Sequence, residues 1–359
     1  MTSTGENIHL DHPNCWRSER DAAADNAAST ASALECSKSL YHRYNTSIGM
    51  VSVSDDAGAT LFARLAAPTA ERTTRLAIFG DTHVAARATG TDRQFEHTER
   101  RLRQVVADVN ARDVDVVAGV GDLTKDGEPW NVDLVADVLD DLTAPYVTIP
   151  GNHDVAASDT DDQVSLETFV ERFPPGRLPF HERHAGVDLI GLNSVAPDKL
   201  VDEEQREWLD ETLSDASTPI VLVHHNLPAF TAQLAAFRQA AGEDASPPAA
   251  IENAAAVADV LAAHDAPVVF TGHRHRPGLA AYRGVTEIAT AATCVYPQSY
   301  LLATIDDRGT TIRHVPLLSR EAAEASFAVQ REQGNPSKAA LAAIHLANLP
   351  LREDWRPDG

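Results

Sequence analysis

Short apolar runs, separated by polar or helical stretches, dominate the chain from Arg75 onward. Each run has the length of a β-strand and is bounded by Gly, Pro or polar residues, which is typical of buried strands in an α/β domain. The runs cover residues 76–79, 114–118, 146–149, 189–192, 220–223 and 268–270. They predict an α/β fold class.

Helical patterns fill several of the gaps between these runs. Apolar residues recur at the i, i+3, i+4, i+7 spacing of an amphipathic helix within residues 102–109 and again within 135–142. Another helix is expected to start at Asp202, whose side chain can cap it, with Gln205 three residues later. These helices are expected to pack on the sheet.

The two ends of the chain differ in texture from this central part. Residues 1–40 are polar with little periodicity and are interpreted as a weakly ordered leader, and residues 41–70 as a short β extension at an edge of the main domain. The main domain is expected over residues 71–318, closing with a hairpin. Residues 319–359 are interpreted as a tail that starts helical and ends rich in Pro.

Five of the six apolar runs end in a cluster of polar side chains. The carboxyl ends of neighbouring strands in an open α/β sheet meet at one crevice, so clusters far apart in sequence can form a single site. The clusters are Asp81-Thr82-His83, Gly121-Asp122, Gly151-Asn152-His153-Asp154, His224-His225 and Gly272-His273-Arg274-His275.

The donors in these clusters indicate a metal centre. They offer oxygen from aspartate and asparagine and nitrogen from imidazole, a mixture that suits Mn, Fe, Zn or Co, and they lack the thiolates of structural zinc sites. One ion takes four to six donors, so seven protein ligands plus water favour two ions that share an aspartate, roughly 3.5 to 4 Å apart. The seven are Asp81, His83, Asp122, Asn152, His224, His273 and His275.

At this point the clusters resemble the calcineurin-like metallophosphoesterase family, whose pattern is D-x-H, G-D, G-N-H-D/E, H and G-H-x-H in this order. All five blocks are present, and the resemblance covers about residues 75–317. It implies a four-layer αββα sandwich, with two central mixed β-sheets flanked by helices. It also implies a metal-dependent phosphoesterase with two divalent transition metal ions, Mn, Fe or Zn.

The resemblance assigns a role to each donor. Carried over residue by residue, it implies two sets of three ligands and one bridging carboxylate: Asp81, His83 and His275; Asn152, His224 and His273; and Asp122 between them.

Two pairs of residues, His224-His225 and His153-Asp154, include neighbours of the predicted ligands. In the family the first histidine of the His224-His225 pair is the ligand, and proline usually follows the pair one residue later, whereas here it is delayed to Pro228. By resemblance His153 contacts the substrate phosphate or the leaving oxygen, and Asp154 orients its ring. His153 and Asp154 are therefore the expected catalytic residues.

The expected reaction is hydrolysis of a phosphoric ester by in-line attack of a metal-activated water. Residues 121–128 look like the family branch of cyclic-nucleotide and glycerophosphodiester phosphodiesterases, in which G-D-L-T is followed by Gly. Small phosphodiesters or monoesters are therefore the expected substrates. The sequence does not choose among a cyclic nucleotide, a glycerophosphodiester and another ester, and it gives no oligomeric state.

Two other functions compete with this interpretation. A nuclease on the same scaffold would need a basic channel, whereas the only clustered arginines are Arg100, Arg101 and Arg103 on one predicted helix. A non-catalytic metal-binding scaffold should lack ligands, and every block is complete here.

Charge and cysteine content restrict the partners and the compartment. The formal net charge of −23 repels polyanions, which disfavours nucleic acid as a partner. No stretch approaches the roughly 20 apolar residues of a membrane span, and the start of the chain is polar rather than a secretion signal. The cysteines are few and scattered, which favours a reducing compartment. The chain is expected to be cytoplasmic, with no membrane partner.

Lysine is rare, whereas arginine, aspartate and alanine abound. We interpret this bias as a hypothesis of adaptation to high intracellular salt, as in an acidic halophile-like protein, since salt would screen the repulsion between acidic side chains. The free energy of unfolding, measured by chemical denaturation, is then expected to be higher in molar KCl than in dilute buffer. Equal values would contradict the hypothesis.

Overall fold

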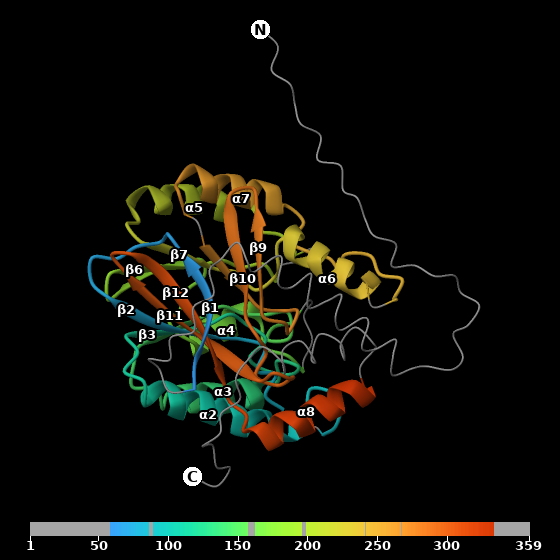
Figure 1. The fold of residues 1–359 in the computed structure, drawn as a ribbon. Helices are drawn as coiled ribbons and strands as arrows, with labels where there is room; N and C mark the ends of the chain where they lie inside the picture. Colours follow the sequence, from blue (N-terminus) through green and yellow to red (C-terminus); the bar gives the residue numbers. More distant parts are fainter. Residues whose placement is uncertain are drawn as a thin grey trace, which may run out of the picture.

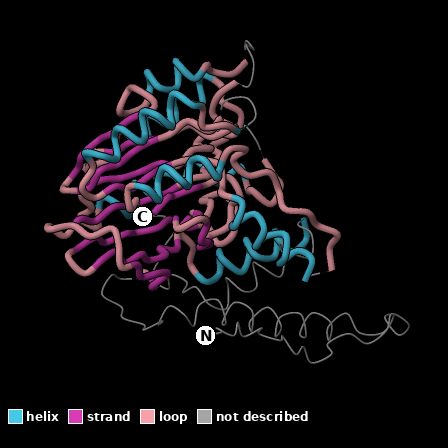
Figure 2. Tube along the Cα trace, turned by 90° about the horizontal axis from the view of Figure 1, so that it is seen from above, coloured by secondary structure: helices cyan, strands magenta, loops and turns pink. Residues whose placement is uncertain are grey.

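Two β-sheets lie face to face between two layers of helices in the computed structural model of the protein (Figure 1). The structure describes residues 58–85, 89–156, 162–195, 199–240, 242–266 and 268–333. Seen from above, helices cross over the strands and lie beside them (Figure 2). The four-layer αββα sandwich that the resemblance implied is confirmed.

The first sheet mixes a parallel half with an antiparallel half. Its strand order is β1-β12-β11-β2-β3-β4, in which β2, β3 and β4 are parallel and β1, β12 and β11 are antiparallel to their neighbours. The bounds are β1 Thr60–Leu65, β2 Thr74–Phe79, β3 Val116–Gly119, β4 Tyr146–Thr148, β11 Ser299–Asp306 and β12 Gly309–Pro316. The helices on this side are η1 Phe95–His97, α2 Thr98–Asn110, α3 Pro129–Leu139, α4 Leu166–Arg172 and α8 Arg320–Gln333.

The second sheet has the order β5-β6-β7-β8-β10-β9, with β6, β7, β8 and β10 parallel. Its bounds are β5 Phe180–His184, β6 Val187–Gly191, β7 Pro219–Leu222, β8 Val268–Thr271, β9 Gly278–Tyr282 and β10 Val285–Ala289. The helices on this side are α5 Glu203–Asp215, α6 Pro228–Ala240 and α7 Ala254–Ala263. None of the described helices combines the length and the apolar composition needed to cross a membrane.

The alternation of side chains along β2 explains why both faces of the sheet are apolar. Leu76 and Ile78 pack in the core between the two sheets, together with Phe270 of β8. Ala77 and Phe79 point to the opposite face and pack with the apolar stripes of α2 and α3. A strand that is buried on both faces reads as a continuous apolar run, which is the pattern found in the sequence.

The strands expected from the sequence are present with bounds shifted by one or two residues, and the two helical patterns correspond to α2 and α3, which begin earlier than expected, at Thr98 and Pro129. α5 begins as expected, because the Asp202 side chain accepts a hydrogen bond from the backbone N–H of Gln205 at 2.9 Å. β5, α4, α6 and α7 have no counterpart among the elements expected from the sequence. β1 forms an edge of the first sheet by pairing with β12. The leader, residues 41–57 and residues 334–359 lie outside the described residues, and the division of the chain into four parts stays a prediction.

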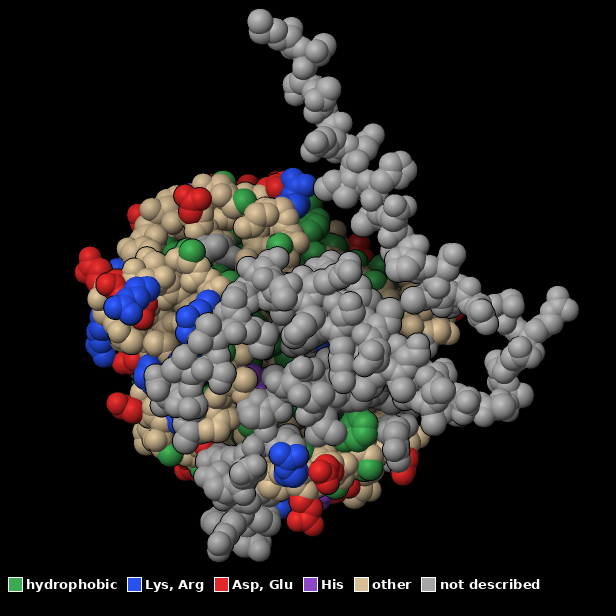
Figure 3. All heavy atoms as spheres, in the orientation of Figure 1, with side chains coloured by type: hydrophobic (Ala, Val, Ile, Leu, Met, Phe, Trp, Pro, Cys, Tyr) green, Lys and Arg blue, Asp and Glu red, His purple; other side chains and the backbone are tan. Residues whose placement is uncertain are grey.

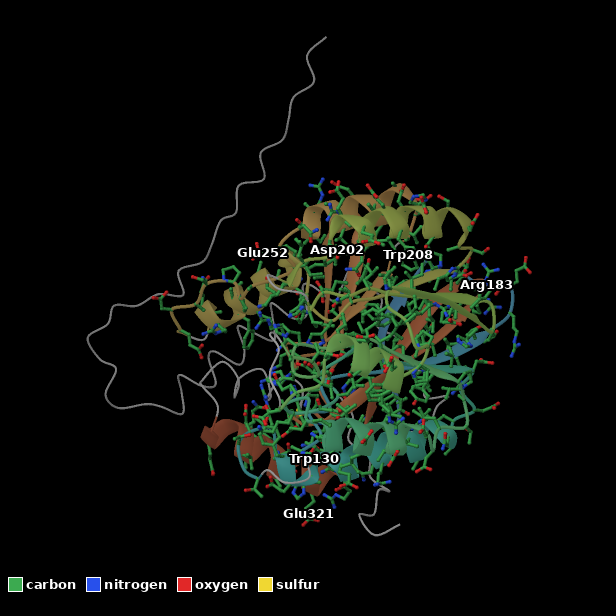
Figure 4. All side chains as sticks on the ribbon, turned by 180° about the vertical axis from the view of Figure 1, so that it is seen from behind. Trp130, Arg183, Asp202, Trp208, Glu252 and Glu321 are labelled. Atoms are coloured by element: carbon green, nitrogen blue, oxygen red, sulfur yellow. The ribbon has the colours of Figure 1, made fainter. Side chains whose placement is uncertain are left out.

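A buried carboxylate joins β5, β6 and β7 at the sheet end opposite to the polar clusters. Asp188 accepts hydrogen bonds from the backbone N–H groups of Ser217 and Thr218, both at 2.9 Å, and from Arg183 Nε at 2.8 Å. Arg183 lies at the rim of the molecule (Figure 4). Burial alone would raise the pKa of Asp188, but these donors outweigh it and lower the pKa to about 2.

Asp188→Asn is expected to lower the free energy of unfolding by about 2 kcal/mol at neutral pH, because hydrogen bonds to a charged acceptor are lost. The depressed pKa makes this contribution complete above the unfolded-state value of 3.8 and loses it as the pH falls to about 2. Urea denaturation from neutral to acidic pH measures the difference. The control is Asp259→Asn, which removes an exposed pair with Arg283 and should cost under about 1 kcal/mol; a loss no larger than the control's would contradict this role for Asp188.

Candidate metal centre

The polar clusters that follow β2, β3, β4, β7 and β8 meet where the two sheets face each other. Backbone hydrogen bonds join the loops: Asp81 N–H donates to Gly121 O at 2.9 Å, and His83 N–H donates to Asp122 O at 3.0 Å. Across the sheets, the His273 N–H donates to Asp81 Oδ1 at 2.8 Å. These hydrogen bonds hold the loops together without a metal ion.

Several residues in these loops adopt a strained backbone. A positive φ is uncommon for residues other than glycine, and it costs energy that the surrounding structure must supply. The predicted ligands with positive φ are Asp81 (49°), His83 (42°), Asp122 (51°), His273 (71°) and His275 (56°). Strain gathered in this way is typical of functional sites.

Two glycines allow the loops to approach closely. A Cβ atom on Gly121 would lie 2.6 Å from Gly151 N and 2.7 Å from His224 Nδ1, and one on Gly151 would lie 2.2 Å from Asp122 Oδ1. A larger residue at either position would push the ligand loops apart, which explains the Gly before Asp122 and the Gly before Asn152.

The first group of donors lies at the ends of β2, β3 and β8. Asp81, His83, Asp122 and His275 each offer a ligand atom within 4.8 Å of the others. His83 Nε2 and His275 Nε2 are 2.9 Å apart, and His83 Nε2 is 3.5 Å from Asp122 Oδ2. This arrangement can hold one cation.

The second group consists of imidazoles. His224, His225 and His273 each offer a nitrogen within 4.8 Å of the others. His224 Nδ1 donates to the Val120 carbonyl at 2.8 Å, which leaves Nε2 free to bind a cation, and this Nε2 is 3.3 Å from Asp122 Oδ2. Asp122 Oδ2 therefore lies within 3.5 Å of a nitrogen from each group.

Asn152 lies in the loop after β4, directly before His153, whose backbone supports Asp122. Its side chain is exposed, whereas the next residue, His153, donates its backbone N–H to Asp122 Oδ1 at 2.9 Å. The seven predicted ligands thus include six that the structure brings together by side-chain distances, and Asn152 at the exposed margin of the same site.

The chemistry of the donors fits cations. Buried polar atoms in proteins nearly always have a hydrogen-bond partner, so those without one call for an ion or water. The buried side-chain atoms of this kind at the site are Asp81 Oδ2, His83 Nδ1, His224 Nε2, His225 Nε2 and His273 Nε2.

Protonation states also favour metal binding. Burial lowers the pKa of His83 and that of His225 to about 3, and it lowers the pKa values of His273 and His275 as well, so these imidazoles are neutral near pH 7. Neutral imidazole is the form that binds metal ions.

The carboxylates and His224 titrate together. Burial raises the pKa of Asp81 to about 8, and the nearby Asp122 carboxylate adds to this. Burial would lower the pKa of His224, but the Asp122 carboxylate raises it to about 9, while His224 and His83 hold the pKa of Asp122 well below its usual range. A cation held by these groups would take the place of the shared proton.

The structure corrects the expected role of Asp154. The ring of His153 donates from Nδ1 to the Lys125 carbonyl at 2.7 Å, so a carbonyl oxygen orients it. Asp154 instead accepts hydrogen bonds from the backbone N–H groups of Leu123, Thr124 and Gly151 at 2.7 to 3.1 Å. The expectation that Asp154 orients the His153 ring was wrong, because a buried carboxylate among free N–H groups binds the backbone first. Asp154 holds the loops of Asp122 and Asn152 together.

Sequence reasoning missed Cys294 at this site. This buried cysteine offers its Sγ within 4.8 Å of ligand atoms of His83 and His275. The strand pairing explains its place, because residues 290–294 follow β10, which is parallel to β8. The carboxyl end of β10 therefore lies at the same edge as the other clusters.

Comparisons with known proteins identify a matching family model, similar sequences and a similar fold. The family model of calcineurin-like phosphoesterases matches residues 74–277. A probable cyclic nucleotide phosphodiesterase from Synechococcus is 28% identical over 134 residues, which cover 36% of this chain and 49% of that protein. Another probable cyclic nucleotide phosphodiesterase, from Psychrobacter arcticus, is 25% identical over 224 residues, which cover 59% of this chain and 76% of that protein. A dimetal phosphatase from Danio rerio shares the fold, with a TM-score of 0.52 and 15% identity. The match covers 69% of this chain and 98% of that protein. The match thus spans about half the length of the Synechococcus protein.

Proposed function

Because the chain belongs to the calcineurin-like phosphoesterase family, we propose that it hydrolyses small phosphoric esters with two divalent metal ions. The observation that carries the proposal is the place of Asp122, whose Oδ2 lies 3.5 Å from His83 Nε2 and 3.3 Å from His224 Nε2. One carboxylate oxygen between two groups of donors would allow a pair of cations to share Asp122.

Each ion has its own set of ligands in this proposal. The set for the first is Asp81, His83 and His275, the set for the second is Asn152, His224 and His273, and Asp122 is shared. The distances within the first group and the unpartnered nitrogens of the second support this assignment. Mixed oxygen and imidazole donors suit Mn, Fe or Zn.

A phosphoric ester resists attack because its own negative oxygens repel a nucleophile. Two bound cations supply positive charge and an activated water. The protein supplies the ligands, among them the buried carboxylates of Asp81 and Asp122. His153, when protonated, donates from Nδ1 to the Lys125 carbonyl and keeps a second N–H at Nε2 for the leaving oxygen.

The substrate is proposed to be a small phosphodiester or monoester. Two relatives are named as probable cyclic nucleotide phosphodiesterases, which favours a diester among these. On the face drawn in Figure 3, the described Lys and Arg side chains lie among acidic ones rather than in a patch of their own. Together with the net charge of −23, this ranks a nuclease second. A cytoplasmic location, as the cysteine content favours, remains part of the proposal.

Metal analysis combined with a panel of esters tests the proposed function. We expect about two transition metal ions per chain, hydrolysis of bis-p-nitrophenyl phosphate, and loss of both on treatment with a chelator. Asp122→Asn should abolish measurable turnover, because a neutral amide cannot join the two ions. The control is Asp307→Asn in the exposed β11–β12 turn, which should behave as the original protein does. Metal-loaded protein that hydrolyses no ester would favour the non-catalytic scaffold.

His153→Ala is expected to lower turnover by roughly a hundred- to ten-thousand-fold while leaving the metal content unchanged, because a proton donor rather than a ligand is removed. The loss should depend on the leaving group. Hydrolysis of an alkyl diester such as glycerophosphocholine releases an alkoxide, which needs the proton. Hydrolysis of bis-p-nitrophenyl phosphate releases nitrophenolate, which is stable as an anion. Steady-state kinetics on both esters measures the difference, and an equal loss on both would exclude proton donation by His153.

A further inference from the structure

The turn after β7 presents two consecutive histidines to the same site. Neighbouring residues of a strand point to opposite faces of the sheet, so one of the two would ordinarily face away. Here β7 ends at Leu222, and both rings lie beside His273. The ring centroids of His224 and His225 are 5.1 Å apart, and those of His225 and His273 are 4.5 Å apart.

The His225 ring is oriented as a metal ligand is. Its Nδ1 lies 3.0 Å from Ser194 Oγ, and its backbone N–H donates to the same oxygen at 3.2 Å. When Nδ1 carries the ring proton and donates it to Ser194 Oγ, the lone pair of Nε2 is left for another partner. That Nε2 is buried and has no hydrogen-bond partner among the described residues. Metal-binding histidines are typically held in this way, by a partner on the other ring nitrogen.

A second buried network fixes the turn that carries His225. Glu287 of β10 accepts hydrogen bonds from Asn226 Nδ2 at 2.9 Å and from the Leu227 N–H at 3.1 Å. It also accepts one from Thr271 Oγ1 at 2.8 Å, two residues before His273. Asn226 and Leu227 are the residues that delay the proline expected after the histidine pair. The chain thus departs from the family pattern here and ties the altered turn to the loop of His273.

We propose that His225 is a further ligand of the second metal ion, oriented by Ser194. The proposal rests on the two-metal function proposed above and adds a residue to it. The second site would then hold three imidazoles, whereas the first holds two imidazoles and its own aspartate. Imidazole suits Zn and Fe, and carboxylate suits Mn, so the two sites should differ in metal preference.

Titration of metal-free protein with Zn²⁺ or Co²⁺ tests the proposal. His225→Ala and the larger His225→Gln should each lower the affinity for the second ion by more than about 100-fold and leave the affinity for the first unchanged. Ser194→Ala, which removes only the orienting hydroxyl, should cost about 10- to 100-fold. The visible absorption of the Co²⁺ protein should change in both His225 variants, because a nitrogen ligand is lost. The control is His264→Ala, whose ring pairs with Asp210 and lies outside the ligand groups; it should bind as the original protein does.

The outcomes separate this proposal from the proposed function. Original protein that binds fewer than two ions would contradict the two-metal function, and the His225 proposal would fall with it. If the original protein binds two ions and both His225 variants keep its affinities and Co²⁺ spectrum, His225 is not a ligand and the function stands. Equal losses in Ser194→Ala and the His225 variants would assign His225 a positioning role and overturn ligation. Circular dichroism checks folding, and if the Ala variant unfolds, His225→Gln decides.

Discussion

The buried carboxylate of Asp122 is the group on which the proposed centre depends. It is taken out of water, yet it faces nitrogens from both sheets within 3.5 Å. Burying such a charge is costly unless it is compensated. Nearby imidazoles compensate it by sharing a proton, and divalent cations would do so more fully. The same residue thus sets the charge of the site and joins the donors of one sheet to those of the other.

The backbone around Asp122 shows how that position is maintained. Gly121 and Gly151 leave room where a Cβ would collide, and Asp154 binds three backbone N–H groups of the adjoining loops. The loops adopt strained conformations that are stable only because these contacts determine them together. Hydrogen bonds to Asp154 and positive φ values at the ligands are therefore two aspects of one arrangement.

Much of this could be predicted from the sequence, for a physical reason. A strand buried on both faces must be apolar throughout, so runs such as residues 76–79 stand out, and the residues after them lie at one sheet edge by topology alone. The cap of α5 at Asp202 is a local signal of the same kind. Rules of this type act over a few residues, so a single sequence is enough to apply them.

What could not be predicted depends on which atoms meet across the fold. Asp154 was expected to bind the His153 ring, but its carboxylate accepts hydrogen bonds from three backbone N–H groups of the neighbouring loops. Cys294 gave no spacing signal, because its relation to His83 arises only from the order of strands in two sheets. The inward position of His225, after β7, likewise depends on Ser194. It also depends on Glu287 of β10, which lies more than sixty residues away along the chain. Motifs therefore identify the donors of a site that spans two sheets, but they do not determine which of its atoms meet. The remainder comes from inter-sheet packing around residues such as Ile78 and Phe270, because this packing fixes how far apart the two sets of ligand loops lie.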